Sequence, residues 1–259
     1  MKEELILFDS NCMLGPSTEN EGESFCDKES LIKAMDYYKI SKALVYGSFA
    51  KNNCPEEGNQ VLSSLVGNTK SLYKSYLVLP SYTGEFPGGK SLIKEFEDNG
   101  VVSARLAPNK FNFTLESWNV DTLLGILEDI NMPLFLDLDL NHWSDEVPWP
   151  AIHRICKTFP KLTVVLCRIG CGYNRILFPL MDCCSNLKFE TSYFDTNNGI
   201  KAVVERFGSE RLLFGTDMPI HNPSCPTGML YFSQISDEDK QAIAHKNLEK
   251  LIGGVNYGK

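Results

Sequence analysis

The feature that most constrains the fold of this chain is an alternation of two segment types that recurs eight times. Each unit joins a short apolar run, typical of a strand covered on both faces, to a longer segment whose apolar residues recur at helical spacing. The runs are residues 5–9, 42–48, 74–80, 101–108, 133–140, 162–170, 187–194 and 211–217. Eight such units close a barrel, so we predict an α/β fold, a parallel eight-stranded (β/α)8 TIM barrel.

Helix signals and chain length agree with this prediction. Ser236 precedes Asp239 at the spacing of a capping box, and Gly100 and Gly208 lie where helices should end. The 259 residues suit one barrel, so we expect a single domain over residues 1–259. The main competitor is an open doubly wound sheet, but no G-x-G-x-x-G follows the first apolar run, so a dinucleotide site has no support.

Composition limits the partners and the location. The formal net charge is −8, which disfavours binding to nucleic acid or to an anionic membrane and favours a small-molecule substrate. Two glutamates precede a four-residue apolar run at the start of the chain, unlike a secretory signal, so we expect a cytoplasmic protein. The nine cysteines include no C-x-x-C pair and are expected to be reduced thiols, with Cys183 and Cys184 packing in a helix.

Polar residues at the ends of the predicted strands are the candidates for chemistry, because barrel active sites form at the carboxyl ends of the strands. Residues two apart on a strand share a face. Asp9, Asn11 and Met13 should therefore point the same way, as should Asp137 and Asp139, while the leucines between face the helices. The full set of strand-end candidates is Asp9, Asn11, Arg105, Asp137, Asp139, Arg168, Glu190 and Asp217.

Loop residues on the same face add candidates for proton transfer and for pocket walls. His142 and His221 follow the fifth and eighth strands, and an imidazole exchanges protons near neutral pH. Either could equally be an ordinary loop histidine. Tyr173, with Tyr193, Trp143 and Trp149, could line a pocket or simply pack at the rim. His153 and His245 fall within helices and are interpreted as surface or packing residues.

Several segments resemble one known family. LLFGTDMP at Leu212 to Pro219, with the helix ISDEDKQAIAHKNLEKLI after it, is similar to the closing segment of the amidohydrolase-related branch of the amidohydrolase superfamily. That branch includes aminocarboxymuconate-semialdehyde decarboxylase and several lactonases. PEEGN at Pro55 to Asn59 and VSARLAP at Val102 to Pro108 also resemble family segments, and the resemblance runs over nearly the whole chain.

The chain departs from the family at the metal ligands that the resemblance implies. Family members begin D-x-H-x-H-x-G, and here Asn11 and Met13 stand at the two histidine positions. The histidine of the fifth strand falls on Asp137 and that of the sixth on Arg168, whereas the aspartate of the eighth strand is kept as Asp217. An amide and a thioether are poor zinc ligands, and a guanidinium repels a divalent ion, so we expect neither the family zinc site nor another cofactor.

The departures lead to one hypothesis and two alternatives. In the first, Arg168 replaces the metal in a hydrolase-like enzyme for a small carboxylated or carbonyl metabolite, catalysing hydrolysis, lactone opening or decarboxylation. Asp217 is then the base, Asp137 or His221 supplies a proton, and Arg105 helps to bind the substrate anion. Asn11, Asp139, Glu190, His142 and Tyr173 complete the predicted binding site.

The first alternative is a pseudoenzyme barrel that binds a small molecule without turnover. The second is a metallohydrolase with an atypical ligand set, for which Cys12 or Cys167 could supply a thiolate. Cys167 is the weaker donor, because it should point toward the helices if Arg168 points inward. The family resemblance also makes a homodimer an open possibility.

Overall fold

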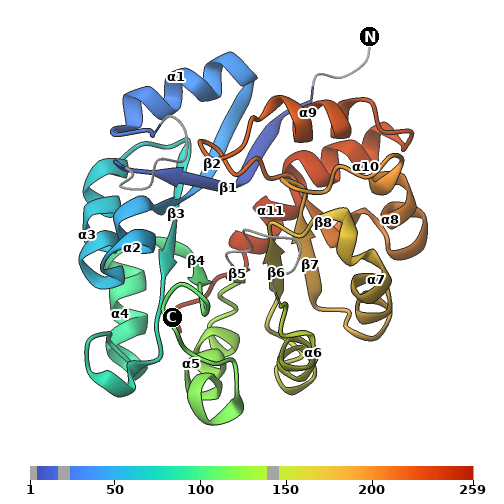
Figure 1. The fold of residues 1–259 in the computed structure, drawn as a ribbon. Helices are drawn as coiled ribbons and strands as arrows, with labels where there is room; N and C mark the ends of the chain where they lie inside the picture. Colours follow the sequence, from blue (N-terminus) through green and yellow to red (C-terminus); the bar gives the residue numbers. More distant parts are fainter. Residues whose placement is uncertain (1–4, 17–23, 139–145, 259) are drawn as a thin grey trace.

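The computed structural model of the protein describes residues 5–16, 24–138 and 146–258 (Figure 1). Eight parallel strands follow one another in chain order around a single sheet. Their bounds are β1 Leu7–Leu14, β2 Ile40–Gly47, β3 Leu72–Leu77, β4 Val101–Leu106, β5 Leu134–Asp137, β6 Val164–Cys167, β7 Leu187–Glu190 and β8 Leu212–Leu213. This confirms the predicted barrel and all eight of its strands.

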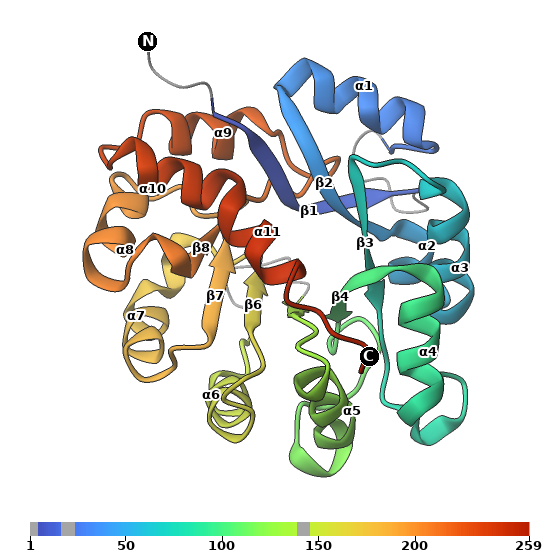
Figure 2. The ribbon, with the colours of Figure 1, turned by 180° about the vertical axis from the view of Figure 1, so that it is seen from behind.

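Helices surround the strands on the outside (Figures 1 and 2). Their bounds are α1 Lys28–Tyr38, α2 Ser48–Asn52, α3 Pro55–Val66, α4 Gly89–Asn99, α5 Ser117–Asp129, α6 Trp149–Thr158, α7 Asn174–Cys183, α8 Gly199–Phe207, α9 Ser224–Tyr231, α10 Asp237–Gln241 and α11 Asn247–Ile252. Short 3-10 turns lie at Ser81–Thr83, Cys171–Tyr173 and Ser209–Arg211.

Backbone hydrogen bonds between the first and last strands close the barrel. Although β8 itself has two residues, the chain beyond it continues alongside β1. Ser10 donates to the Phe214 carbonyl at 2.9 Å and Met13 donates to the Met218 carbonyl at 2.9 Å. This seam brings the middle of β1 against residues 214–218. The candidate residues Asn11 and Asp217 therefore lie next to each other across it.

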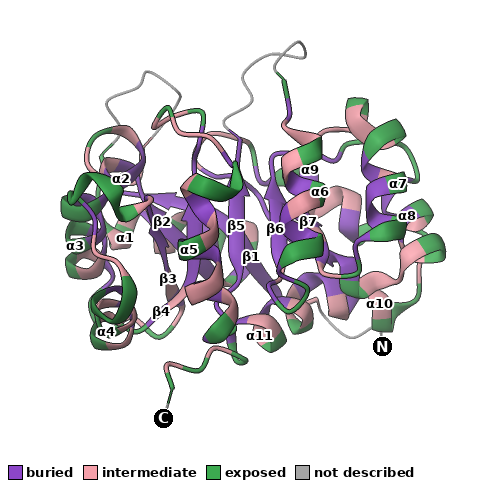
Figure 3. Ribbon diagram, turned by 90° about the horizontal axis from the view of Figure 1, so that it is seen from below, coloured by how far each residue is buried: buried purple, intermediate pink, exposed green. Residues whose placement is uncertain are grey.

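Buried side chains form an outer and an inner layer. Figure 3 shows that the strands between the helices are mostly buried. Leu136 and Leu138 belong to the outer layer between strands and helices, as predicted from their alternation with Asp137. The inner layer lies inside the barrel, where Leu248 and Ile252 of α11 pack against it; its strand residues are Phe8, Leu44, Phe135, Val165, Cys167 and Leu213. Figure 2 shows α11 crossing that end of the barrel. An apolar floor thus supports the polar residues at the opposite ends of the strands.

The predicted helix signals operate as expected. The Ser236 hydroxyl accepts the Asp239 amide at 3.0 Å and caps α10, while Gly100 and Gly208 end α4 and α8. The predicted continuous last helix is instead interrupted by a π-helical turn at Ala242–Lys246. In this turn the Ile243 carbonyl accepts the Phe214 amide at 3.0 Å, which ties the helix to the barrel seam.

Among the described residues, no helix has the length and apolar character needed to cross a membrane.

Candidate active site

Seven buried polar side chains meet at the carboxyl ends of the strands and form what we call the central cluster. Each is at most 5% exposed, and each comes from a different one of the eight βα units. The members are Asn11, Lys51, Arg105, Asp137, Arg168, Glu190 and Asp217. Hydrogen bonds and ion pairs connect all seven. Polar residues that the sequence analysis placed at the strand ends therefore do lie together in the structure.

Arg105 joins the two halves of the cluster. Its Nη1 lies 3.1 Å from Asp137 Oδ2 and its Nη2 donates to Asn11 Oδ1 at 2.9 Å. The guanidinium also lies over the Tyr46 ring, 4.0 Å from the centroid. Burial alone would lower the pKa of Arg105, but Cys167, Asp137 and Tyr46 raise it above its ordinary value, so the side chain stays charged.

Lys51 is a member that the sequence analysis missed. It lies on α2, directly after β2, and its Nζ is 3.4 Å from Asp137 Oδ2, the same oxygen that Arg105 contacts. Helix α2 packs closely on α3 because Gly58 has no side chain: a Cβ there would lie 2.1 Å from the Ala50 nitrogen. The position of Lys51 four residues after the end of β2, on the carboxyl side of that strand, is the signal that could have found it.

Arg168 and Asp217 form the ion pair at the other side of the cluster. Arg168 Nε lies 3.0 Å from Asp217 Oδ2, and the side chains are 4% and 0% exposed. Both residues have left-handed backbones, with φ of 58° and 57°. Burial would lower the pKa of Arg168, but Asp217 and Asp137 raise it well above its ordinary value. The pair is therefore held as an ion pair in the protein interior.

The backbone at Arg168 also corrects one prediction. Cys167 was expected to point toward the helices, yet its Sγ lies 3.6 Å from Arg105 Nη1 inside the barrel. The left-handed residue that follows interrupts the alternation of a strand, so Cys167 and Arg168 both reach the interior. Burial is the main cause that raises the pKa of the Cys167 thiol, which therefore stays protonated.

Asn11 and Glu190 complete the cluster as fixed hydrogen-bonding groups. Asn11 Nδ2 donates to Asp217 Oδ1 at 3.2 Å and to Glu190 Oε1 at 3.3 Å. Glu190 further accepts the Arg168 amide at 2.6 Å and both the amide and the hydroxyl of Ser192 at 2.7 Å. Gly215 makes room for this carboxylate, because a Cβ there would lie 2.4 Å from Glu190 Oε2.

Asp9 lies beside the cluster with a different set of partners. The register of β1 shifts between Asp9 and Cys12, which interrupts the alternation behind the prediction that Asp9, Asn11 and Met13 share a face. Asp9 Oδ1 accepts the Thr216 amide at 2.9 Å, and the Thr216 hydroxyl donates to Oδ2. Burial raises the pKa of Asp9 to about 7, against the lowering effect of these hydrogen bonds.

The strand-end candidates from the sequence comprise five acids and two cations, an excess of three negative charges. Counting Asp9 with the cluster, the structure describes four acids and three cations, so full ionisation leaves one excess negative charge. Lys51 supplies the additional cation, and Asp139 lies outside the described residues. Burial also raises the pKa of Glu190, so protonation of Asp9 or Glu190 removes the remaining excess.

The remaining candidates lie at the rim. The His221 ring stacks on Tyr193, with centroids 4.4 Å apart, and its amide donates to the Asp217 carbonyl at 3.0 Å. The Tyr193 hydroxyl in turn hydrogen-bonds the Asp217 carboxylate, so His221 and Tyr193 both border this acid. Tyr173 packs on Trp149 of α6 at 5.7 Å. His142 lies outside the described residues.

The donor set of the central cluster does not fit a divalent metal ion. Asp137 Oδ2 faces two cations, Asp217 Oδ2 faces Arg168, and Asn11 Oδ1 accepts from Arg105. Among the described residues, the acids and thiols here form no group of three ligands close enough to share an ion. A metal would have to displace buried guanidinium groups from the carboxylates that neutralise them.

Comparison by sequence gives one match. Residues 135–254 match the amidohydrolase family. They include Asp137, Arg168, Glu190 and Asp217, so the match covers the half of the barrel that supplies all three acids of the central cluster. None of the curated proteins matches the chain significantly.

Solved structures resemble the whole chain. An uncharacterized TIM-barrel protein from Bordetella bronchiseptica is 16% identical, with a TM-score of 0.75 over 98% of this chain and 100% of its own. The 2,6-dihydroxybenzoate decarboxylase from Rhizobium is 15% identical, with a TM-score of 0.74 over 96% of this chain and 99% of its own.

A third similar structure contains a metal. The dihydroxybenzoic acid decarboxylase from Polaromonas sp. JS666, with bound manganese and the inhibitor 2-nitroresorcinol, is 12% identical. Its TM-score is 0.75 over 96% of this chain and 97% of its own. At such identities the likeness shows a shared fold.

Proposed function

Residues 135–254 match the amidohydrolase family, and from that match we propose that this chain is a member of the amidohydrolase superfamily whose central cluster is the active site of a metal-independent hydrolase or decarboxylase. Its substrate is a small carboxylated or carbonyl compound. The observation that carries the proposal is the Arg168–Asp217 pair, 3.0 Å apart and buried, which places a guanidinium directly beside the candidate base. The dihydroxybenzoic acid decarboxylase with bound manganese uses this fold with a metal, and the guanidinium offers an organic cation in a comparable barrel.

The pair suits acid–base chemistry on an anionic substrate. A guanidinium presents planar donors that match a carboxylate, so Arg168 would orient the substrate and stabilise negative charge that develops on it. Asp217 then acts as the general base, on water for hydrolysis or on a substrate hydroxyl for decarboxylation. His221, next to Asp217, is placed to return a proton to the product.

Arg105 serves this site best as a positioning residue. Its two terminal nitrogens contact Asp137, Asn11 and Cys167, and its side chain is fully buried. It therefore holds Asn11 toward Asp217 and places a cation beside the Asp137 carboxylate. Lys51, on the same Asp137 oxygen, assists in that task.

Substitution of Asp217 tests the proposal. Hydroxylated benzoates and lactones, which the decarboxylase-like fold suggests, are screened for turnover by mass change, and Asp217→Asn is then assayed on the best substrate. We expect a loss of about a hundredfold to ten-thousandfold, the contribution of a general base. The control Asp36→Asn, an exposed carboxylate on α1, should keep full turnover. Full turnover by Asp217→Asn would refute the assignment.

Chelation separates the metal-independent mechanism from the metallohydrolase alternative. Protein treated with a chelator should keep its activity, and added Mn²⁺ or Zn²⁺ should not increase it. Activity that disappears with chelation and returns with metal would overturn the role of Arg168.

A binding protein without turnover is the second candidate. The saturation of the cluster favours it, because Glu190 already accepts four hydrogen bonds from protein groups. Such a protein would show ligand-dependent thermal stabilisation without any change in ligand mass. Conversion of a stabilising ligand would exclude this candidate.

A further inference from the structure

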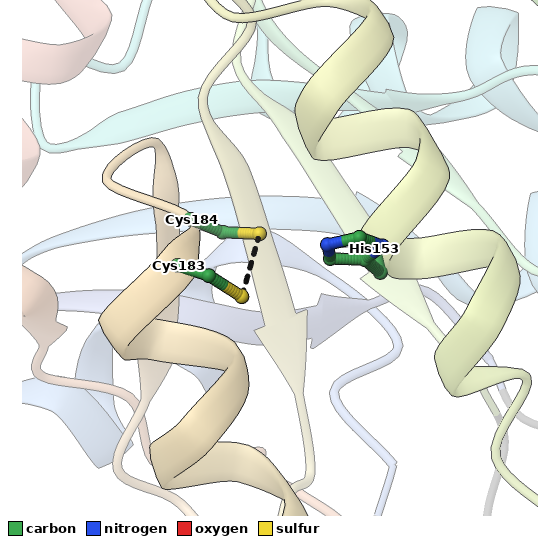
Figure 4. Close-up of side chains that lie close together, drawn as sticks. All are labelled: His153, Cys183 and Cys184. Carbon is green, nitrogen blue, oxygen red and sulfur yellow. Dashed lines mark hydrogen bonds between the residues drawn. The ribbon is translucent and has the colours of Figure 1, made fainter.

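A group of soft donor atoms lies between two outer helices, away from the central cluster (Figure 4). His153 is on α6, Cys183 is the last residue of α7, and Cys184 follows it. One ligand atom from each lies within 4.8 Å of the other two. The sequence analysis interpreted these residues as surface or packing residues, because the 30 positions between them hide their proximity.

The separation of the two sulfurs is that of metal ligands. Zn–S bonds of about 2.3 Å at a tetrahedral angle place two thiolates about 3.8 Å apart. Cys183 Sγ and Cys184 Sγ are 3.9 Å apart, far from the roughly 2.05 Å of a disulfide. In Figure 4 the His153 ring faces the two sulfurs across the gap between the helices. The three ligand atoms lie within 4.8 Å of one another, so they face a common point between the helices.

Neighbouring side chains hold the two cysteines in place, while the site of His153, Cys183 and Cys184 stays open to solvent on one side. Arg211 Nη2 donates to the Cys184 carbonyl at 2.6 Å, and Lys157 Nζ donates to the Cys183 carbonyl, so the backbone of both cysteines is held. Cys156, one turn beyond His153, is buried and hydrogen-bonds the Cys184 sulfur. His153 and Cys183 are exposed, which gives an ion a path of entry and room for a water ligand.

We propose that His153, Cys183 and Cys184 form a binding site for a thiophilic cation, with Zn²⁺ the best fit. Two thiolates and a neutral imidazole are ligands that Zn²⁺ prefers and that Mg²⁺ and Ca²⁺ do not. Binding releases the two thiol protons, so the complex carries no net charge. Cys156 donates its hydrogen bond to the Cys184 thiolate and orients it. The ion would cross-link α6 to α7 and stabilise the outer ring of the barrel.

Zinc titration of the reduced full chain tests the site. Protein stripped with a chelator is titrated with Zn²⁺ against a chromophoric competitor, and we expect one equivalent to bind per chain. Cys183→Ser should weaken binding by at least about a hundredfold, because it removes a ligand itself, where loss of an outer partner costs about tenfold to a hundredfold. Cys225→Ser, an exposed cysteine on α9, is the matched control and should bind as wild type.

Two further measurements keep the test independent of folding and of the active site. Zn²⁺ should raise the unfolding temperature of wild type but not of Cys183→Ser, and Co²⁺ should give wild type the charge-transfer band of thiolate ligation. Asp217→Asn should bind Zn²⁺ unchanged, which separates this site from the proposed function. The proposal is overturned if wild type binds no Zn²⁺, if Cys183→Ser retains wild-type affinity, or if the reduced pair only oxidises to a disulfide.

Discussion

Lys51 provides the sharpest test of how the central cluster is held together. The substitution Lys51→Met keeps the length and apolar stem of the side chain and removes its charge. Asp137 Oδ2 then loses a cation at 3.4 Å and keeps Arg105 at 3.1 Å. Because both partners are buried, water cannot replace the missing charge.

The size of the effect follows from the geometry. Two unit charges 3.4 Å apart interact by about 5 kcal/mol at an effective dielectric of about 20, before desolvation is subtracted. Removing one partner of a buried pair costs about 3–5 kcal/mol. Arg105 still neutralises Asp137, so we expect the lower end, about 3 kcal/mol in the free energy of unfolding.

Urea unfolding at pH 7 measures this cost as a lowered midpoint with an unchanged slope. The double variant Lys51→Met/Asp137→Asn should lose less than the two single variants together, by about 1–3 kcal/mol, if the residues interact directly. Lys94→Met is the matched control, because Lys94 pairs with Asp98 at side-chain exposures of 73% and 58%. It should cost less than about 0.5 kcal/mol. An equally small cost for Lys51→Met, or additive losses in the double variant, would refute the buried pair.

Two further predictions concern the seam and the buried acids. Asp9 has a pKa of about 7 in the folded protein against 3.8 as its ordinary value, so the folded state holds the proton more tightly. Its contribution to stability is full below about pH 4 and is lost as the pH rises to about 7, at no more than about 1.4 kcal/mol per pH unit. Asp9→Asn should remove this loss, so the stability of wild type minus that of the variant should fall between pH 4 and 7 in urea titrations; a flat difference would contradict the assignment. Gly215→Ala places a Cβ 2.4 Å from Glu190 Oε2 and should cost about 1–3 kcal/mol, read as a lower unfolding temperature. An unchanged unfolding temperature would show that Glu190 moves aside freely.

The barrel could be predicted from the sequence because the strand and helix patterns that indicate it are local and recur in each of the eight βα units. Each apolar run forms its strand, and the predicted caps at Ser236, Gly100 and Gly208 all operate. The rule that chemistry lies at strand ends also brought Asn11 and Asp217 together, although 206 positions separate them. The spacing of apolar residues and the position of a residue within its βα unit are enough to predict the strands, the helix ends and the side chains at the strand ends.

The parts that the sequence did not predict depend on backbone irregularities and on packing between units. The register shift in β1 and the left-handed backbone at Arg168 both change which side chains reach the barrel interior. No residue type or spacing in the sequence indicates either irregularity. Lys51 of the second βα unit reaches Asp137 of the fifth, and Gly58 lets α2 and α3 of that second unit touch. The grouping of His153 with Cys183 requires the tertiary fold.

The apolar floor beneath the central cluster makes the two ends of the barrel different, because it closes one end and leaves the polar residues at the other. Since Leu248 and Ile252 of α11 pack against the inner layer from one end, reactants, products and solvent protons must arrive and depart through the opposite end. Evolution of a new specificity in such a scaffold would therefore alter the loops that follow the strands. Substitutions in α11 would change the thermal stability of the fold and leave the ligand specificity unaltered.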